Sequence, residues 1–186
     1  VAGTGGPYLF GGLHNRPLEG GGLGGRPLAD LWRLDQAGGE GVALASAPTP
    51  RAHHAVAWSD ALGGLVVHGG FSMSVADTDM VEAVASTEMW LWRMETNSWH
   101  SVLQTVEGGD DTVLGRLAHS LTAGSDGRLL MHGGRDLPPD TIQTWIGDLS
   151  ETLDGDTSTI ECLWSVAPHQ SGARHGHSAV HDDEGL

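Results

Sequence analysis

The feature that most constrains this chain is an internal repeat. A short apolar run that ends in two adjacent glycines occurs three times, at residues 8–12, 65–70 and 129–134. An Arg-x-x-His element also occurs three times, at residues 51–54, 116–119 and 174–177. An acidic residue, an apolar residue and a tryptophan follow two of the glycine pairs, at residues 30–32 and 88–90. Because these elements recur in the same order, we expect a stack of similar units.

Each repeated element has a physical interpretation. The apolar run, bounded by turn residues, predicts a buried strand, and the glycine pair supplies positive φ angles or close backbone approach where that strand ends. The tryptophans can fill the wedge between neighbouring sheets, and the Arg and His side chains can satisfy buried carbonyls between them. We therefore predict structural roles for Gly11, Gly12, Gly69, Gly70, Gly133, Gly134, Trp32, Trp90, Trp99, Trp145, Trp164, Arg51, His54, Arg116, His119, Arg174 and His177.

Together these elements resemble the kelch repeat. The resemblance implies an all-β fold, a propeller of four-stranded antiparallel blades around a central axis. Residues 87–99 fit best, because they supply the third strand, the turn and the fourth strand with its second tryptophan. The first unit lacks that second tryptophan, and its fourth strand is expected near residues 42–45. The third unit departs further, because Trp145 follows its glycine pair sooner and an acidic insertion precedes Trp164.

The resemblance divides the chain into four parts. Residues 1–50 form a partial blade (its second to fourth strands) with a Gly-rich loop, and residues 51–105 form a complete blade. Residues 106–170 form a blade with an acidic insertion, and residues 171–186 hold the first strand of a further blade. Since propellers close with four to eight blades, we expect further sequence on both sides, or partner chains that cover the open edges.

No pattern in the sequence predicts a catalytic residue, a metal site or a cofactor site. Residues 20–25 match G-x-G-x-x-G but lead into another strand and not a helix, so we interpret them as a loop. Residues 154–158 resemble the start of a calcium loop, but Thr159 and Ser165 stand where Gly and Glu are needed. His175 and His177 alternate as metal ligands on one strand would, yet His177 belongs to the repeat. Cys162 lies in an apolar strand, which is typical of an inert core thiol.

Two long connections separate a glycine pair from the next tryptophan strand. They span residues 13–29 and 71–87, and connections of this length are usually functional or disordered. The second carries Asp77, Asp79 and Glu82, and residues 76–85 are compatible with a short acidic helical turn. Such loops share one rim of a propeller, so we expect them to form a composite surface for a protein partner.

Charge and composition narrow the possible functions. The net charge is −15, with 24 acidic side chains against 9 arginines and no lysine. This charge should repel nucleic acid and anionic lipid and favour a basic protein partner. One cysteine and no Asn-x-Ser/Thr sequence weakly favour the cytoplasm. We expect a non-catalytic scaffold for protein interaction. The alternatives are an extracellular receptor or matrix propeller that binds protein or glycan, and a copper oxidase resembling galactose oxidase.

Overall fold

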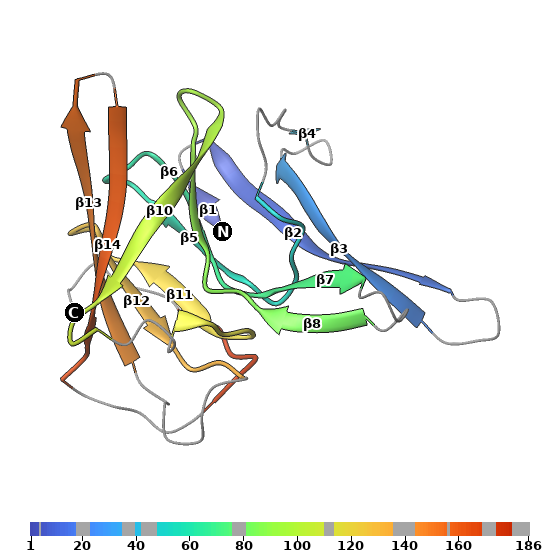
Figure 1. Ribbon diagram of the computed structural model, residues 1–186. Coiled ribbons are helices and arrows are strands. Elements are labelled where there is room, and N and C mark those ends of the chain that lie inside the picture. Colours follow the sequence, from blue (N-terminus) through green and yellow to red (C-terminus); the bar gives the residue numbers. More distant parts are fainter. Residues whose placement is uncertain are drawn as a thin grey trace.

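The computed structural model describes residues 1–3, 5–17, 23–34, 40–41, 48–75, 81–109, 114–135, 144–155, 157–168 and 174–179. Within these residues the regular elements are β-strands, so the protein is almost entirely β (Figure 1). No helix in the described part of the chain is long and apolar enough to cross a membrane. The strands are β1 (Ala2–Gly3), β2 (Gly6–Pro17), β3 (Leu23–Arg33), β4 (Glu40–Gly41), β5 (Ala55–Ser59), β6 (Gly64–His68), β7 (Phe71–Val75), β8 (Val81–Ala85), β9 (Met89–Arg93), β10 (Ser98–Val106), β11 (Ser120–Ala123), β12 (Arg128–His132), β13 (Thr144–Asp154) and β14 (Thr157–Val166).

The strands form three four-stranded units in chain order. The first unit is β1-β2-β3-β4, the second is β5-β6-β9-β10 and the third is β11-β12-β13-β14, each with antiparallel neighbours. Strands β7 and β8 form a separate hairpin. This arrangement is propeller-like, because successive antiparallel sheets stack face to face and bury their apolar residues between them.

The second and third units are also joined at their outer strands, which the sequence did not predict. Strand β10 leaves β9 after Ser101, and Val102–Val106 then pair in parallel with Ile160–Trp164 of β14. The Trp164 indole N–H donates a hydrogen bond to the Gln104 side chain across this seam (2.9 Å). The two units therefore share one eight-stranded sheet, which folds back so that β11 contacts β5.

The register of the strands shows that the three units are equivalent. Trp32 lies opposite Leu9, Trp90 opposite Val67 and Trp145 opposite Met131. In each unit the partner stands two residues before the first glycine of the pair. Trp145 therefore occupies the same place as the other two tryptophans, although its connecting segment is shorter.

The second tryptophan is also equivalent in the second and third units. Trp99 lies opposite Trp92, and Trp164 lies opposite Gly147 at the matching position. A Cβ atom on Gly147 would stand 2.7 Å from the Trp164 ring, so the absence of a side chain there makes room for the buried indole. Trp164 therefore occupies in the third unit the position that Trp99 occupies in the second.

Two predictions about local structure need correction. Ala2–Gly3 already forms a strand beside β2, so the first unit includes part of its first strand. The fourth strand of this unit includes Glu40–Gly41, and the predicted residues 42–45 lie outside the described residues. The expected helical turn over residues 76–85 is wrong for Val81–Ala85, which pairs with Phe71–Val75 as a strand. Alternate residues of 81–85 are apolar and suit a hairpin.

Two apolar layers separate the units. The layer between the first and second units holds Tyr8, Phe10, Leu31, Trp58, Leu65, Val67, Trp92 and Trp99. The layer between the second and third units includes Val66, Met89, Leu91, Leu129, Met131, Trp145, Ile160, Cys162 and Trp164. Tyr8 stacks on Trp58 with 5.2 Å between ring centroids, so the chain's one tyrosine is a core residue.

Candidate functional site

The repeated glycine and arginine residues join each unit to the next through the backbone. In every case the N–H of the second glycine donates a hydrogen bond to the carbonyl of the arginine in the following Arg-x-x-His element. The three bonds run from Gly12 to Arg51 (3.0 Å), from Gly70 to Arg116 (2.9 Å) and from Gly134 to Arg174 (3.0 Å). This repeated contact explains why the two sequence elements recur together.

The arginine side chains then donate hydrogen bonds to the glycine pair of their own unit. Arg51 donates from Nη1 to the carbonyl of Gly69 (3.1 Å), and Arg116 donates to the carbonyl of Gly133 (3.2 Å). Both arginines are buried, and Arg51 also forms an ion pair with Glu88. A buried guanidinium is retained only where its donors find partners, so both arginines lie here in structural contacts with the backbone.

The first glycine of the pair is required by close packing at the junction. Gly69 has a φ of 67° and Gly133 a φ of 68°, in the left-handed region. A Cβ on Gly69 would stand 2.6 Å from the carbonyl oxygen of Arg116, and one on Gly133 would stand 2.3 Å from that of Arg174. A side chain at either position would separate two units.

The histidine of each Arg-x-x-His element packs against the residue that precedes the glycine pair of the previous unit. The ring pairs are Phe10 and His54 (5.3 Å), His68 and His119 (5.0 Å), and His132 and His177 (5.1 Å). His68 Nδ1 and His119 Nε2 are 3.0 Å apart and share one hydrogen bond. His177 is hydrogen-bonded to the Ser120 hydroxyl (2.8 Å).

These surroundings favour neutral histidines. Burial, with the nearby Arg51, lowers the pKa of His54 to about 4. Burial, with Arg116 and Arg51, lowers the pKa of His68 to about 3, and burial beside His68 and Arg116 lowers that of His119. Burial, with the nearby His177 and Arg174, lowers the pKa of His132. Burial, with Arg174 and His175, lowers the pKa of His177. A cationic imidazole would lie among buried guanidinium groups, so protonation of the histidines opposes packing between the units.

A third backbone feature connects all three Arg-x-x-His elements. The residue before each histidine has a left-handed backbone, with φ of 54° at His53, 55° at Ala118 and 65° at Gly176. The N–H of Ala118 donates to the carbonyl of His53, and the N–H of Gly176 donates to that of Ala118 (2.8 Å each). The sequence pattern does not predict this chain of bonds, because the three residues differ in type and only Gly176 signals the conformation.

The remaining residues that the sequence offers as possible thiol, metal or nucleotide sites do not form such a site among the described residues. Cys162 is buried, and burial raises the pKa of its thiol. In the ranges that the structure describes, no three His, Cys, Asp or Glu side chains converge as metal ligands would. His175 is exposed, whereas His177 is hydrogen-bonded to Ser120 at the junction, so the two histidines have different surroundings. The G-x-G-x-x-G segment falls partly outside the described residues, but Leu23–Arg33 forms β3 and not a helix.

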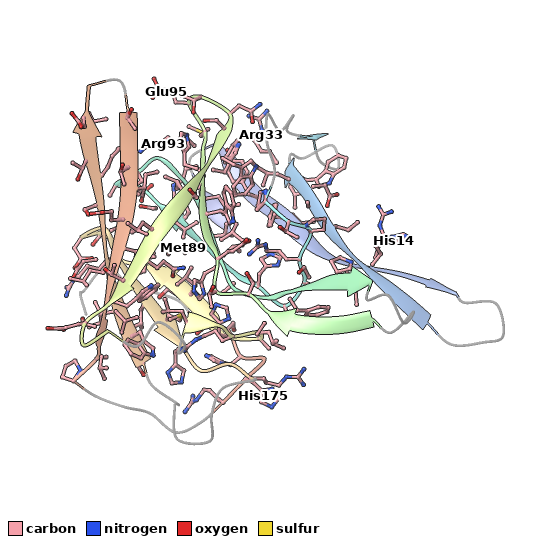
Figure 2. All side chains as sticks on the ribbon, in the orientation of Figure 1. His14, Arg33, Met89, Arg93, Glu95 and His175 are labelled. Atoms are coloured by element: carbon pink, nitrogen blue, oxygen red, sulfur yellow. The ribbon has the colours of Figure 1, made fainter. Side chains whose placement is uncertain are left out.

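The long connections fold as hairpins that project from the sheets. Strands β2 and β3 continue past the glycine pair as far as Pro17 and Leu23, and β7 pairs with β8. Figure 1 shows both hairpins on the side away from β13 and β14, where β7 contacts β3. His14 is exposed on the first hairpin and points away from the sheets (Figure 2). Glu82 lies in β8 opposite Ser74, whereas Asp77 and Asp79 lie outside the described residues.

A groove of about 560 Å³ opens where β10 leaves β9. Two of its polar side chains, Glu88 and Gln104, already have partners within the protein. Glu88 accepts hydrogen bonds from Arg51 and from the Trp90 indole, and Gln104 donates to the carbonyl of Thr87 (2.6 Å). The groove therefore offers few groups for chemistry, and the hairpins remain the better candidate for a binding surface.

The chain shows limited similarity to known proteins. No family model matches the chain, and no curated protein matches it. The chain is similar to the solved structure of YjhT, with 17% sequence identity and a TM-score of 0.45. That similarity covers 71% of this chain and 38% of the YjhT chain, so the chain spans well under two thirds of the length of that structure.

Proposed function

We propose that this chain is a segment of a kelch-type propeller that serves as a non-catalytic scaffold for protein interaction. The observation that carries the proposal is the use of the repeated polar residues. Arg51, Arg116, His54, His119 and His177 all contact neighbouring backbone or rings at the unit junctions. Side chains that elsewhere support catalysis are thus engaged in holding blades together, and binding is left to segments that project from them.

The two hairpins supply the surface of this scaffold. They arise from adjacent units, and contact between β3 and β7 places them on one rim. The second hairpin carries Asp77, Asp79 and Glu82 within a chain of net charge −15. A partner of opposite charge is favoured by this field, so the scaffold should bind a basic protein segment.

Binding of a basic peptide tests this function. A lysine- and arginine-rich decapeptide should bind the protein measurably at low ionic strength and more weakly as salt is added, because salt screens exposed charges. Replacing the hairpin acids (Asp77→Asn, Asp79→Asn, Glu82→Gln) should weaken binding about tenfold, since each exposed pair contributes up to about 1 kcal/mol. Isothermal titration calorimetry measures both effects.

A matched variant distinguishes the effect of the hairpin acids from the effect of net charge. Glu95, Glu107 and Glu161 are exposed acids outside the hairpins, and replacing all three with Gln removes the same charge. This variant should bind the peptide nearly as well as the unchanged protein. Equal losses in the two triple variants would show that the peptide senses only overall charge, and the hairpin would not be the site.

A further inference from the structure

The two hairpins start from adjacent residues of one short segment. The N–H of Arg51 donates a hydrogen bond to the carbonyl of Leu28 in β3 (2.9 Å), at the base of the first hairpin. The next residue, Ala52, exchanges two backbone hydrogen bonds with Phe71 (3.0 and 2.9 Å), at the base of the second hairpin. Because consecutive Cα atoms are about 3.8 Å apart, these bonds fix the two bases side by side. A partner that lies on one hairpin is therefore within reach of the other.

The two hairpins carry opposite charge. Residues 13–29 hold two arginines and one acid, which gives this hairpin a net charge of +1. Residues 71–87 hold three acids and no arginine, which gives a net charge of −3. The first hairpin is thus positive although the whole chain has a net charge of −15. The rim where they lie presents a positive and a negative region next to each other.

The positive groups of the first hairpin are not compensated within the protein. His14 and Arg26 lie opposite each other across β2 and β3, both are exposed, and Arg16 follows two residues further along β2. Within the part of the chain that the structure describes, neither His14 nor Arg26 forms an ion pair or a side-chain hydrogen bond. Arg93 and Arg128, by contrast, are each paired with an acid. Arg26 is therefore free to bind an acid of a partner.

The contact between the hairpins leaves both charged regions accessible to one partner. The contacting strands are β3 and β7, whereas His14 and Arg16 lie on β2 and Glu82 lies on β8. From Gly12 at the base to Arg16 the strand covers about 14 Å, four residues of β-structure. An extended segment of twelve residues reaches about 40 Å, so one segment is long enough to cover both hairpins.

We infer that the two hairpins together bind one bipolar segment of a partner protein, with acidic residues on the first hairpin and basic residues on the second. The inference rests on the proposed function and specifies the partner of that surface. A basic segment alone satisfies the second hairpin and leaves Arg26 without an acid. Complementary charge on both hairpins also sets the direction in which the partner crosses the rim, because opposed charges fix the register of a complex.

Three peptides of twelve residues test this inference by isothermal titration calorimetry at low ionic strength. The block peptide has five lysines, two glycines and five glutamates in that order, and is also made in the reverse order. In the basic peptide, serines replace the glutamates. In the alternating peptide, the lysines and glutamates of the block peptide alternate. Attraction by the net charge of −15 alone favours the basic peptide, which has no acids. We expect instead that the block peptide, in one of its two orders, binds about tenfold more tightly than either other peptide.

Single arginine substitutions locate the acidic half of the block peptide. Arg26→Gln should weaken binding of the block peptide about fivefold, the effect of one exposed charge pair, and should not weaken binding of the basic peptide. Arg128→Gln is the matched control, because it removes the same charge from the third unit, and it should leave binding of the block peptide unchanged. Circular dichroism establishes that each variant keeps its β-structure.

The outcomes separate this inference from the proposed function. If the basic peptide binds and the block peptide binds no better in either order, the bipolar partner is wrong and the basic partner stands. If Arg26→Gln weakens both peptides equally, Arg26 supports the hairpin and does not bind the acidic half, which also overturns the inference. If none of the peptides binds, the proposed function and the inference are both wrong.

Discussion

Acidification should unfold this protein well above the pH at which its carboxylates titrate. Lowering the pH from about 7.5 to about 5 should reduce the free energy of unfolding on the order of 5 kcal/mol, out of a total of about 5–15 kcal/mol for a typical domain. The cause is the set of histidines at the unit junctions, His54, His68 and His119 above all. In the folded state the pKa values of all three lie below the ordinary 6.5. The pKa is about 4 for His54 and about 3 for His68.

Acid lowers the free energy of unfolding because the unfolded chain takes up more protons than the folded protein. Below about pH 6.5 the unfolded chain binds protons on these imidazoles, whereas the folded protein keeps them neutral until the lower folded pKa is reached. Each such histidine therefore lowers stability by about 1.4 kcal/mol for every pH unit in this window. Its contribution is complete above pH 6.5 and is lost as the pH falls towards 4. Three histidines that titrate together make the loss steep.

Neighbouring charges oppose protonation from every side of the junction. Arg51 and His53 act on His54, and Arg116 and Arg51 act on His68. His119 faces His68, Arg116, His54 and His177. Among the described residues, the carboxylate of Glu88 is bound to Arg51 and to the Trp90 indole. The charged groups that act on these three histidines are arginines and other histidines, so they do not compensate an added positive charge.

The repeat itself provides the variant that tests this explanation. Phe10 stands in the first unit where His68 stands in the second, and it packs on His54 as His68 packs on His119. His68→Phe should therefore fold and should reduce the pH dependence by about 1.4 kcal/mol per pH unit. His175→Gln, at an exposed position, should leave it unchanged. Urea titrations at several pH values and one protein concentration measure both. A urea midpoint that stays constant from pH 7.5 to 5 would rule out the junction histidines as the cause.

Gly69→Ala should destabilise the protein by about 2–5 kcal/mol, the sum of a left-handed alanine and an overpacked junction. The new methyl group would meet the carbonyl oxygen of Arg116 at 2.6 Å and His119 Cε1 at 2.8 Å. These are atoms of the next unit, so relief of the clash requires the second and third units to move apart. That movement weakens the hydrogen bond from Gly70 to Arg116 and the contact between His68 and His119.

Gly63→Ala is the matched control for this change. Gly63 has a φ of 60°, close to the 67° of Gly69, but a Cβ there would meet nothing within 4 Å. The control should cost only the backbone term, about 1 kcal/mol. Chemical denaturation at a fixed protein concentration compares the two variants. Similar losses in both would mean that backbone strain alone makes glycine necessary, and that the junction tolerates a methyl group.

Much of the fold was predictable from the sequence because the repeat marks equivalent positions. The glycine pairs, the Arg-x-x-His elements and the tryptophans each occupy one register position or one junction. Trp145 was harder to place, because a shorter connection changes its sequence spacing but leaves its register opposite Met131 unchanged. The parallel seam between β10 and β14 had no local signal, since it depends on residues far apart in sequence.

The candidate site was less predictable than the fold. Acidic residues at 76–85 suggested a helical turn, but Val81 and Ala85 pair across the hairpin with Val75 and Phe71, and this tertiary pairing outweighs local propensity. The left-handed residues His53 and Ala118 gave no signal, because neither is glycine. Their conformation is stabilised by the bond that Ala118 donates to His53 in the preceding unit.

Amide hydrogen exchange at the glycine pairs tests the central claim, that these residues join one unit to the next. The N–H groups of Gly70 and Gly134 donate across junctions, whereas those of Gly63 and Gly109 donate within single turns to Asp60 and Val106. If the account is correct, Gly70 and Gly134 exchange as slowly as the amides of Leu65–Val67, through global unfolding, and far more slowly than the turn glycines. Exchange of Gly70 and Gly134 at the rate of Gly63 and Gly109 would contradict it, because the junctions would then open freely while the sheets remain folded.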